Sequence, residues 1–171
     1  MKQKTLIVFA TEREASATYK DSLLQHHDIL ITGIGSRAVE NTLAAVVKEY
    51  DIIINAGIVG SMHDHIPTGT AVPIRQVFYE KAKSAIDISP SGYCLLTVDA
   101  PCYEKNGAFD FVDMEGYMVA HICQHANIPL KFIKIVSDIV SVHSSKHIRE
   151  RLPELSLMLS KRLSATLSAD T

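Results

Sequence analysis

Residues 4–10, Lys-Thr-Leu-Ile-Val-Phe-Ala, place five consecutive apolar side chains after two polar ones. An uninterrupted apolar run of this length predicts a strand that is buried on both faces, as the strands of parallel sheets are. Residues 11–25 follow, with apolar side chains at helical spacing from Ala15 to Leu24, and they predict a helix. A strand followed at once by a helix is typical of sheets whose parallel strands are joined by helices.

The same alternation continues along the chain. Further strands are predicted at 28–32, 51–55, 70–79, 93–98 and 131–137, and further helices at 36–50, 113–126 and 145–168. Ser36 is placed to cap the second helix, and Ala56-Gly57 to close the third strand. We therefore expect one α/β domain over residues 1–171, a three-layer α/β/α sandwich around a mixed, mainly parallel twisted sheet.

The composition argues against several partners and locations. The formal net charge is −2, the pI is about 6.4, and Lys and Arg form no stripe, so neither nucleic acid nor a membrane surface is an expected partner. No segment has the pattern of a signal peptide or a membrane-spanning helix. The chain has three cysteines and no CxxC pair, a number and spacing that do not favour a disulfide framework. The expected location is the cytoplasm.

Histidine is abundant, with eight copies, yet none lies in an HExxH motif or another zinc-ligand spacing. Surface and loop histidines are the usual case. We expect no bound metal and no cofactor.

In sheets of this kind the ligand lies at the carboxyl ends of the strands. That rule selects five short segments, which should ring a single cleft: 11–14, 33–37, 55–61, 99–103 and 137–141.

Two carboxylates, Glu14 and Asp138, follow different predicted strands and can divide the roles of acid and base. Hydrolysis of an N-glycosidic bond needs that division, because the leaving base gains a proton while water loses one. Each carboxylate also has a structural interpretation. Thr11-x-x-Glu14 has the spacing of a helix-capping box, and Ser137-Asp138 is compatible with ordinary turn chemistry. The residues alone leave both interpretations open.

Asp113-Met114-Glu115 stands at the start of a predicted helix, where acidic residues often cap backbone amides. In the functional interpretation, Glu115 accepts hydrogen bonds from two ribose hydroxyls and Met114 packs on the sugar. Gly33-Ile34-Gly35 lacks the third glycine of a dinucleotide fingerprint and is explained equally well by a tight turn.

Taken together, five motifs occur in a recognisable order. They are residues 10–14 (Ala-Thr-Glu-Arg-Glu), 32–35 (Thr-Gly-Ile-Gly), 53–57 (Ile-Ile-Asn-Ala-Gly), 112–115 (Val-Asp-Met-Glu) and 135–138 (Ile-Val-Ser-Asp). This set resembles the purine nucleoside phosphorylase/nucleosidase superfamily, and most closely its 5′-methylthioadenosine/S-adenosylhomocysteine nucleosidases. The fold implied is nucleoside phosphorylase-like, in a shortened form, because the segment before Gly33 lacks strands that most members have.

The resemblance implies specific roles. Asp138 would protonate the purine at N7, and Glu14 would activate water. Glu115 would hold the ribose 2′- and 3′-hydroxyls beside Met114, and the backbone at Cys102 would read the edge of the base. The family usually forms homodimers in which the partner completes part of each pocket.

The resemblance also places Gly57, Ser137 and Ile34 in the substrate site, together with three positions that depart from the family's usual residues. Ile58 replaces a serine, and Lys134 replaces an arginine. Pro101 stands where an aromatic residue stacks on the base, although Tyr103 is close enough to compensate. Lys134 has the same side-chain parity as Asp138 on the predicted strand, so its ammonium could take over part of the arginine's role.

Three alternatives to such a nucleosidase stay open. A phosphorylase would need arginine and serine near the third strand, where Asn55 and Ile58 suit a dianion poorly. Futalosine hydrolase, a nucleosidase of menaquinone biosynthesis, would use the same acid and base on a larger 5′ group. A non-catalytic homologue that only binds a nucleoside would keep the fold without the chemistry.

Overall fold

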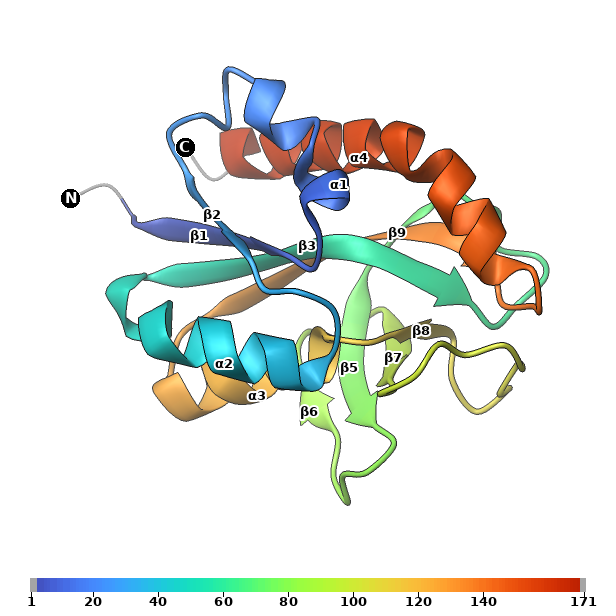
Figure 1. The fold of residues 1–171 in the computed structure, drawn as a ribbon. Coiled ribbons are helices and arrows are strands. Elements are labelled where there is room, and N and C mark those ends of the chain that lie inside the picture. Colours follow the sequence, from blue (N-terminus) through green and yellow to red (C-terminus); the bar gives the residue numbers. More distant parts are fainter. Residues whose placement is uncertain (1–2, 170–171) are drawn as a thin grey trace.

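The computed structural model describes residues 3–169, which form a single mixed sheet with helices on both faces (Figure 1). The strands are β1 (Thr5–Phe9), β2 (Asp28–Ile31), β3 (Ile52–Ser61), β4 (Ala71–Val72), β5 (Ile74–Tyr79), β6 (Ile86–Asp87), β7 (Tyr93–Thr97), β8 (Phe111–Asp113) and β9 (Leu130–Ile139). The α-helices are α1 (Glu12–Ala15), α2 (Ser36–Val46), α3 (Gly116–Ala126) and α4 (Ser144–Ala169). Two short 3₁₀ turns, η1 (Thr18–Lys20) and η2 (Val47–Glu49), complete the helical elements of this range.

The long strand β3 organises the sheet. Its first half pairs in parallel with β1, and its whole length pairs in parallel with β9. Its last two residues turn to β8 in antiparallel fashion, and the order then runs β8-β7-β5-β6. Parallel pairs outnumber antiparallel ones, with β1–β2, β5–β7 and β7–β8 also parallel. The predicted mixed, mainly parallel sheet is confirmed.

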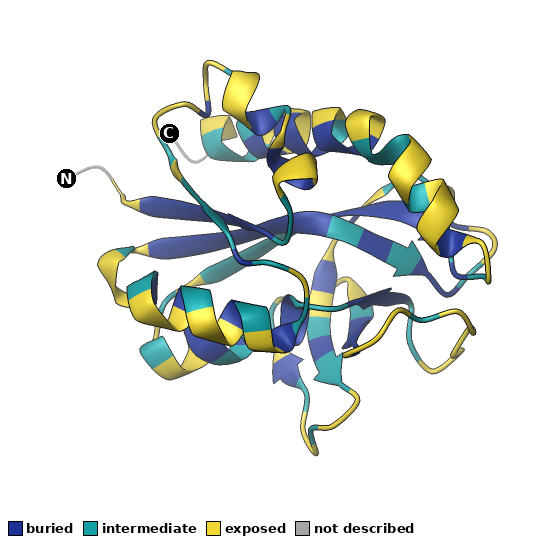
Figure 2. Cartoon of the chain, viewed as in Figure 1, coloured by how far each residue is buried: buried dark blue, intermediate teal, exposed yellow. Residues whose placement is uncertain are grey.

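Helices α1 and α4 cover one face of this sheet, and α2 and α3 cover the other, so the predicted three layers are confirmed (Figure 1). Strands β1 and β3 are buried along most of their length, whereas the helices bury only one side (Figure 2). Leu155, Leu159 and Leu163 of α4 recur every four residues and pack against Phe9 and Ile54 of the sheet. This spacing is that of an amphipathic helix, which explains why the segment docks there.

The predicted helix over residues 11–25 is wrong beyond its first turn. The N–H of Ala17 donates to the hydroxyl of Ser156 on α4 at 2.9 Å, and that hydroxyl donates to the carbonyl of Glu14 at 2.8 Å. A continuing helix would use both backbone groups itself. Packing on α4 therefore ends α1 at Ala15 and leaves Leu23 exposed.

Other predicted boundaries shift for similar reasons. The third strand does not close at Ala56-Gly57, because β9 pairs with β3 as far as Ser61. The short strands β6 and β8 were not predicted. Asp113 ends β8 instead of opening α3, and Ser36 is the first residue of α2, with Gly35 at the cap position.

No helix within residues 3–169 combines the length and the apolar character that a bilayer crossing needs.

The contact between α4 and the sheet yields a stability prediction. Leu159→Ala should lower the free energy of unfolding by about 2–5 kcal/mol, because the side chain is fully buried and leaves a cavity. Leu157→Ala, on the exposed side of the same helix, should cost less than about 1 kcal/mol. Urea unfolding of both variants checks this, and equal losses would contradict the assigned helix orientation.

Candidate active site

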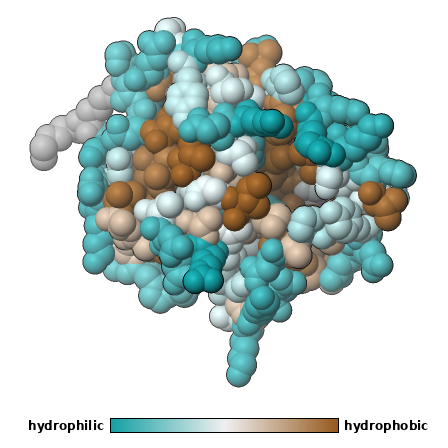
Figure 3. Space-filling view, in the orientation of Figure 1, coloured by the Kyte–Doolittle hydropathy of each residue, from teal (hydrophilic) through white to brown (hydrophobic). Residues whose placement is uncertain are grey.

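A cavity of about 390 Å³ lies at the carboxyl ends of the strands. All five segments that were predicted to ring a cleft contribute to its wall, through Thr11, Ile34, Ile58, Cys102 and Asp138 among others. Apolar side chains surround the hollow, and hydrophilic side chains border it on the side of α1 and α4 (Figure 3). The strand-end rule thus predicted the position of this cavity.

Glu14 reaches this cavity from α1 and is only 5% exposed. One carboxylate oxygen, Oε2, accepts the N–H of Thr11 at 3.0 Å and its hydroxyl at 2.8 Å, which makes the predicted capping box real. The other, Oε1, accepts the N–H of Ile58 at 3.3 Å. Burial raises the pKa of Glu14, although the Thr11 hydroxyl and the Lys134 ammonium oppose the shift. The structural and functional interpretations of Glu14 are therefore compatible.

Asp138 lies in the cavity wall at the end of β9 and is 3% exposed. The pairing of β3 with β9 shifts register there, so that Val59 faces Val136 while Gly60 faces Asp138. Ser137 is the extra residue of this bulge; its hydroxyl donates to Asp138 Oδ1 at 2.6 Å, and the carbonyl oxygen of Val59, 3.2 Å away, is the second acceptor within its reach. Bulges commonly re-aim a side chain beside an active site, and this one directs Asp138 into the cavity.

Glu115 occupies the N-cap position of α3, but its side chain makes no capping hydrogen bond to that helix. Its Oε1 instead accepts the N–H of Gly35 at 2.7 Å, across the turn between β2 and α2. Burial, and then the nearby Asp113 carboxylate, raise the pKa of Glu115 to about 7. Gly35 has a positive φ of 93°, which glycine adopts without strain, and this conformation aims its N–H at Glu115.

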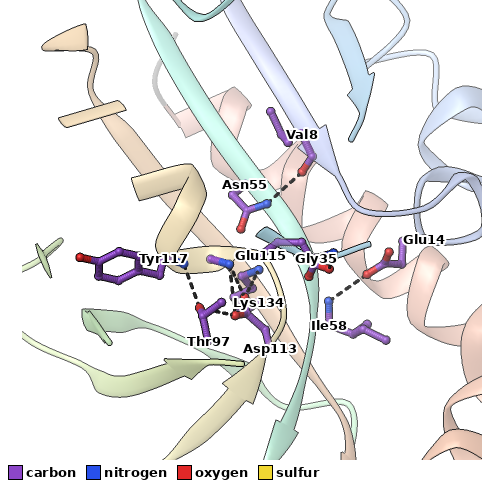
Figure 4. A network of polar contacts seen from close by, with 11 residues as sticks. Val8, Glu14, Gly35, Asn55, Ile58, Thr97, Asp113, Glu115, Tyr117 and Lys134 are labelled. Atoms are coloured by element: carbon purple, nitrogen blue, oxygen red, sulfur yellow. Dashed lines mark hydrogen bonds and ion pairs between the residues drawn. The ribbon is translucent and has the colours of Figure 1, made fainter. Parts of the chain in front are cut away.

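Lys134 is buried behind these carboxylates and does not line the cavity. Its Nζ donates to Asp113 Oδ2 at 3.0 Å, and Asp113 also accepts the Thr97 hydroxyl at 2.7 Å and the N–H of Gly116 at 3.0 Å (Figure 4). The expected placement of Lys134 in the wall beside Asp138 is therefore wrong, because the bulge breaks the alternation of side chains along β9. The Lys134–Asp113 pair itself was not anticipated from the sequence.

Gly57 also lies behind the wall instead of in it. A Cβ at this position would stand 3.4 Å from Glu14 Oε1 and 3.5 Å from Lys134 Nζ. Both are ordinary contact distances, so Gly57 packs beside Glu14 and Lys134 instead of lining the cavity as expected.

The other predicted residues do line the cavity: Ile34, Ile58, Pro101, Cys102, Met114 and Ser137, together with Tyr103. Tyr103 reaches toward α4, where its hydroxyl lies 3.5 Å from the hydroxyl of Ser145. The α4 residues Ile148, Arg149 and Leu152, which also line the cavity, were not predicted, and Arg13 was predicted only as part of the segment 11–14. The i, i+4 spacing of Ile148 and Leu152 was a usable signal, since the pair continues the apolar stripe of α4.

Within residues 3–169, no three His, Cys, Asp or Glu side chains are grouped so that they could hold a metal ion. The pair His63 and Asp110, joined at 3.0 Å between Nε2 and Oδ1, is a surface contact outside the cavity.

The sheet, the two helical layers and the position of the cavity define a nucleoside phosphorylase-like α/β fold. Among solved structures the chain is similar to 5′-methylthioadenosine/S-adenosylhomocysteine nucleosidase (MTAN) from Helicobacter pylori with butyl-thio-DADMe-Immucillin-A, at a TM-score of 0.83 and 15% identity, covering 99% of each chain. It is also similar to Chlamydia trachomatis MTAN bound to MTA, at a TM-score of 0.88 and 23% identity, covering 98% of this chain and 99% of that one.

No protein-family model matches the sequence, and no curated protein matches it. At these identities the similarity establishes the shared fold, which confirms the recognised resemblance at that level.

The buried ion pair yields a prediction. Lys134→Met should lower the free energy of unfolding by about 3–5 kcal/mol, because Asp113 is left as an uncompensated buried charge. Adding Asp113→Asn should restore part of the loss, and exposed Lys48→Met should change stability by less than about 0.5 kcal/mol. Urea unfolding measures all three; additive losses in the double variant would show that the two groups do not interact.

The raised pKa of Glu115 yields a second prediction, for which the sign can be worked out. Between its ordinary value of 4.5 and about 7, the folded state binds more protons at Glu115 than the unfolded state does. The contribution of Glu115 to the free energy of unfolding is therefore fully present below pH 4.5 and is lost as the pH rises to about 7. The difference in unfolding free energy between the wild type and Glu115→Gln should fall across this window and then level off. A difference that rises with pH would contradict the burial of Glu115.

Proposed function

We propose that the protein is a purine nucleosidase that hydrolyses the N-glycosidic bond of a 5′-substituted nucleoside such as 5′-methylthioadenosine or S-adenosylhomocysteine. The observation that carries the proposal is the convergence of two buried carboxylates, Glu14 and Asp138, on one cavity from different strand ends. The similar Helicobacter pylori enzyme is in complex with butyl-thio-DADMe-Immucillin-A and the similar Chlamydia trachomatis enzyme is bound to MTA, and both support a nucleoside-sized ligand.

Asp138 is the acid. As the bond between the ribose anomeric carbon and the purine breaks, the bonding electrons go to the base, and N7 takes the proton of Asp138. The Ser137 hydroxyl, which donates to Oδ1 at 2.6 Å, fixes the rotation of the carboxyl group. A positioned acid of this kind contributes roughly 10²–10⁴-fold to a rate.

Glu14 is the base. A water molecule attacks the anomeric carbon of the ribosyl cation-like centre and gives its proton to the carboxylate. Thr11 and the Ile58 N–H hold that carboxylate in place. Its raised pKa makes it a stronger proton acceptor once ionised, and protonation at low pH would remove its function.

Glu115 and Met114 hold the ribose between these two groups. Gly35 occupies one lone pair of the Glu115 carboxylate and thereby fixes its direction, and the remaining acceptor capacity is offered to the 2′- and 3′-hydroxyls. Pro101 and Cys102 line the part of the cavity assigned to the base, and Tyr103 stands beside them as the aromatic surface.

Hydrolysis is favoured over phosphorolysis by the wall near the end of β3. Ile58 presents an apolar side chain to the cavity, while Asn55 is buried away from it and donates its amide to the carbonyl of Val8 at 3.3 Å. Neither offers the donors that a phosphate dianion needs.

The proposal includes a single domain and a homodimer, as the resemblance implies. Ile34 lines the cavity and is nevertheless 61% exposed, so a second subunit placed against this turn would cover an open side of the pocket.

A base-release assay tests the function. The purified protein should release free base from methylthioadenosine, adenosylhomocysteine, futalosine or inosine at a rate that does not depend on phosphate. A strict phosphate requirement would instead establish a phosphorylase, and no release from any of the four by folded protein would end the enzyme interpretation.

Asp138→Asn should lower kcat by at least about 100-fold and leave the nucleoside Kd nearly unchanged, because the amide keeps the shape but has no acidic proton to give. Glu12→Gln serves as the matched control. Glu12 is exposed and lies two residues from Glu14, the proposed general base, so this variant should keep wild-type kinetics. Equal losses of turnover and binding in Asp138→Asn would make the residue a binding or structural group.

A further inference from the structure

The charges around the cavity are unevenly distributed. The acidic groups Glu14, Asp113, Glu115 and Asp138 lie on α1 and at the ends of β8 and β9. Of the described residues in the wall, Arg13 and Arg149 are the two with a cationic Lys or Arg side chain. They belong to α1 and to the first turns of α4, which lie on the same face of the sheet (Figure 1).

Both guanidinium groups are exposed and lack an acidic partner within residues 3–169. The acidic residues nearest to Arg149 on α4 are paired elsewhere, Glu150 with Lys146 at 3.9 Å and Glu154 with Arg151 at 3.2 Å. Toward the described part of the chain, Arg149 itself donates only through Nε, to the carbonyl of Ser145 at 3.2 Å. The forked donors of both side chains therefore remain for a ligand.

Apolar side chains join the arginines to the rest of the cavity. Ile148 and Leu152 share with Arg149 the side of α4 that faces the cavity, and Ile34 stands next to the Gly35 amide that holds Glu115. A nucleoside with its base at Asp138 and its ribose at Glu115 must send its 5′ substituent into the remaining part of this wall. That part begins apolar and carries the two arginines.

We propose that Arg13 and Arg149 recognise a carboxylate carried at the end of the 5′ substituent, beyond a short apolar linker. The inference rests on the proposed function, because it takes the orientation of the nucleoside from the roles of Asp138 and Glu115. Arginine suits a carboxylate through its planar fork, and the apolar wall suits the thioether or methylene groups that precede it.

Matched probes test the recognition directly. They are 5′-(carboxyethylthio)-5′-deoxyadenosine, its carboxamide, which has nearly the same shape without the charge, and methylthioadenosine. The wild type should favour the acid over the amide in kcat/KM by about threefold to tenfold, as expected for charged hydrogen bonds at exposed groups. Raising the salt concentration should reduce this preference.

Arg13→Gln and Arg149→Gln should each lower the acid-to-amide ratio, and the double variant should bring it to about one, since no charged donor then remains. Arg162→Gln, at the far end of α4 and outside this cavity, is the control and should keep the wild-type ratio. No preference in the wild type, or a preference that persists in the double variant, would overturn the proposal. Consumption of phosphate in an Arg13- and Arg149-dependent reaction would also overturn it, because the arginines would then serve a phosphate co-substrate.

Calorimetric binding of the acid and the amide to Asp138→Asn protein separates this inference from the proposed function. Tighter binding of the acid than of the amide, by the same ratio as in kcat/KM, would support the recognition without any turnover. This preference should disappear when Arg13→Gln and Arg149→Gln are added to Asp138→Asn. If the wild type released no base while this binding preference held, the nucleosidase function would fail and the recognition would stand. Equal binding of acid and amide would overturn the recognition even in an active enzyme.

Discussion

The ammonium group of Lys134 is buried among three carboxylates, and the arrangement of the strand ends depends on it. Lys134 donates to Asp113 at 3.0 Å, and Asp113 in turn accepts from Thr97 on β7 and from Gly116 at the start of α3. A buried charge without a partner costs several kcal/mol of folding free energy. The Lys134–Asp113 pair therefore ties β9 to the end of β8, to β7 and to the start of α3. The same positive charge opposes the rise in the pKa values of Glu14 and Glu115 that burial causes. One interaction thus links the packing of β7, β8, β9 and α3 to the chemistry of the cavity.

Two further contacts set the direction of the acid and base groups. The Ser156 hydroxyl of α4 accepts the N–H of Ala17 and donates to the carbonyl of Glu14. These bonds end α1 after one turn and keep Glu14 close to the carboxyl end of β1. The bulge at Ser137 inserts one residue opposite β3 and turns Asp138 into the cavity while Lys134 stays behind it. A regular helix and a regular strand would have placed both carboxylates differently, so local irregularity is what assembles the pair.

Most of the fold was predictable because strands and helices differ in apolar periodicity. The runs at β1, β2 and β9 and the leucine stripe of α4 are local signals, and each element appeared where its signal lay. The short strands β6 and β8 were not predictable, because two or three residues carry no periodicity and pair only through their neighbours. The helix over residues 11–25 failed for the same kind of reason: Ser156, about 140 positions away in the chain, takes its backbone hydrogen-bond partners.

The sequence by itself determined the layered α/β architecture and the strand ends at which a site would form, since both follow from local pattern and from the geometry of parallel sheets. It also supplied Glu14, Asp138 and Glu115 as candidates. Only the tertiary structure decided which charged groups face the cavity and which stand behind it, placing Arg13 and Arg149 in the wall and Lys134 beneath it. The physical reason is that burial and ion pairing are made by residues distant in the chain, and no local spacing specifies them.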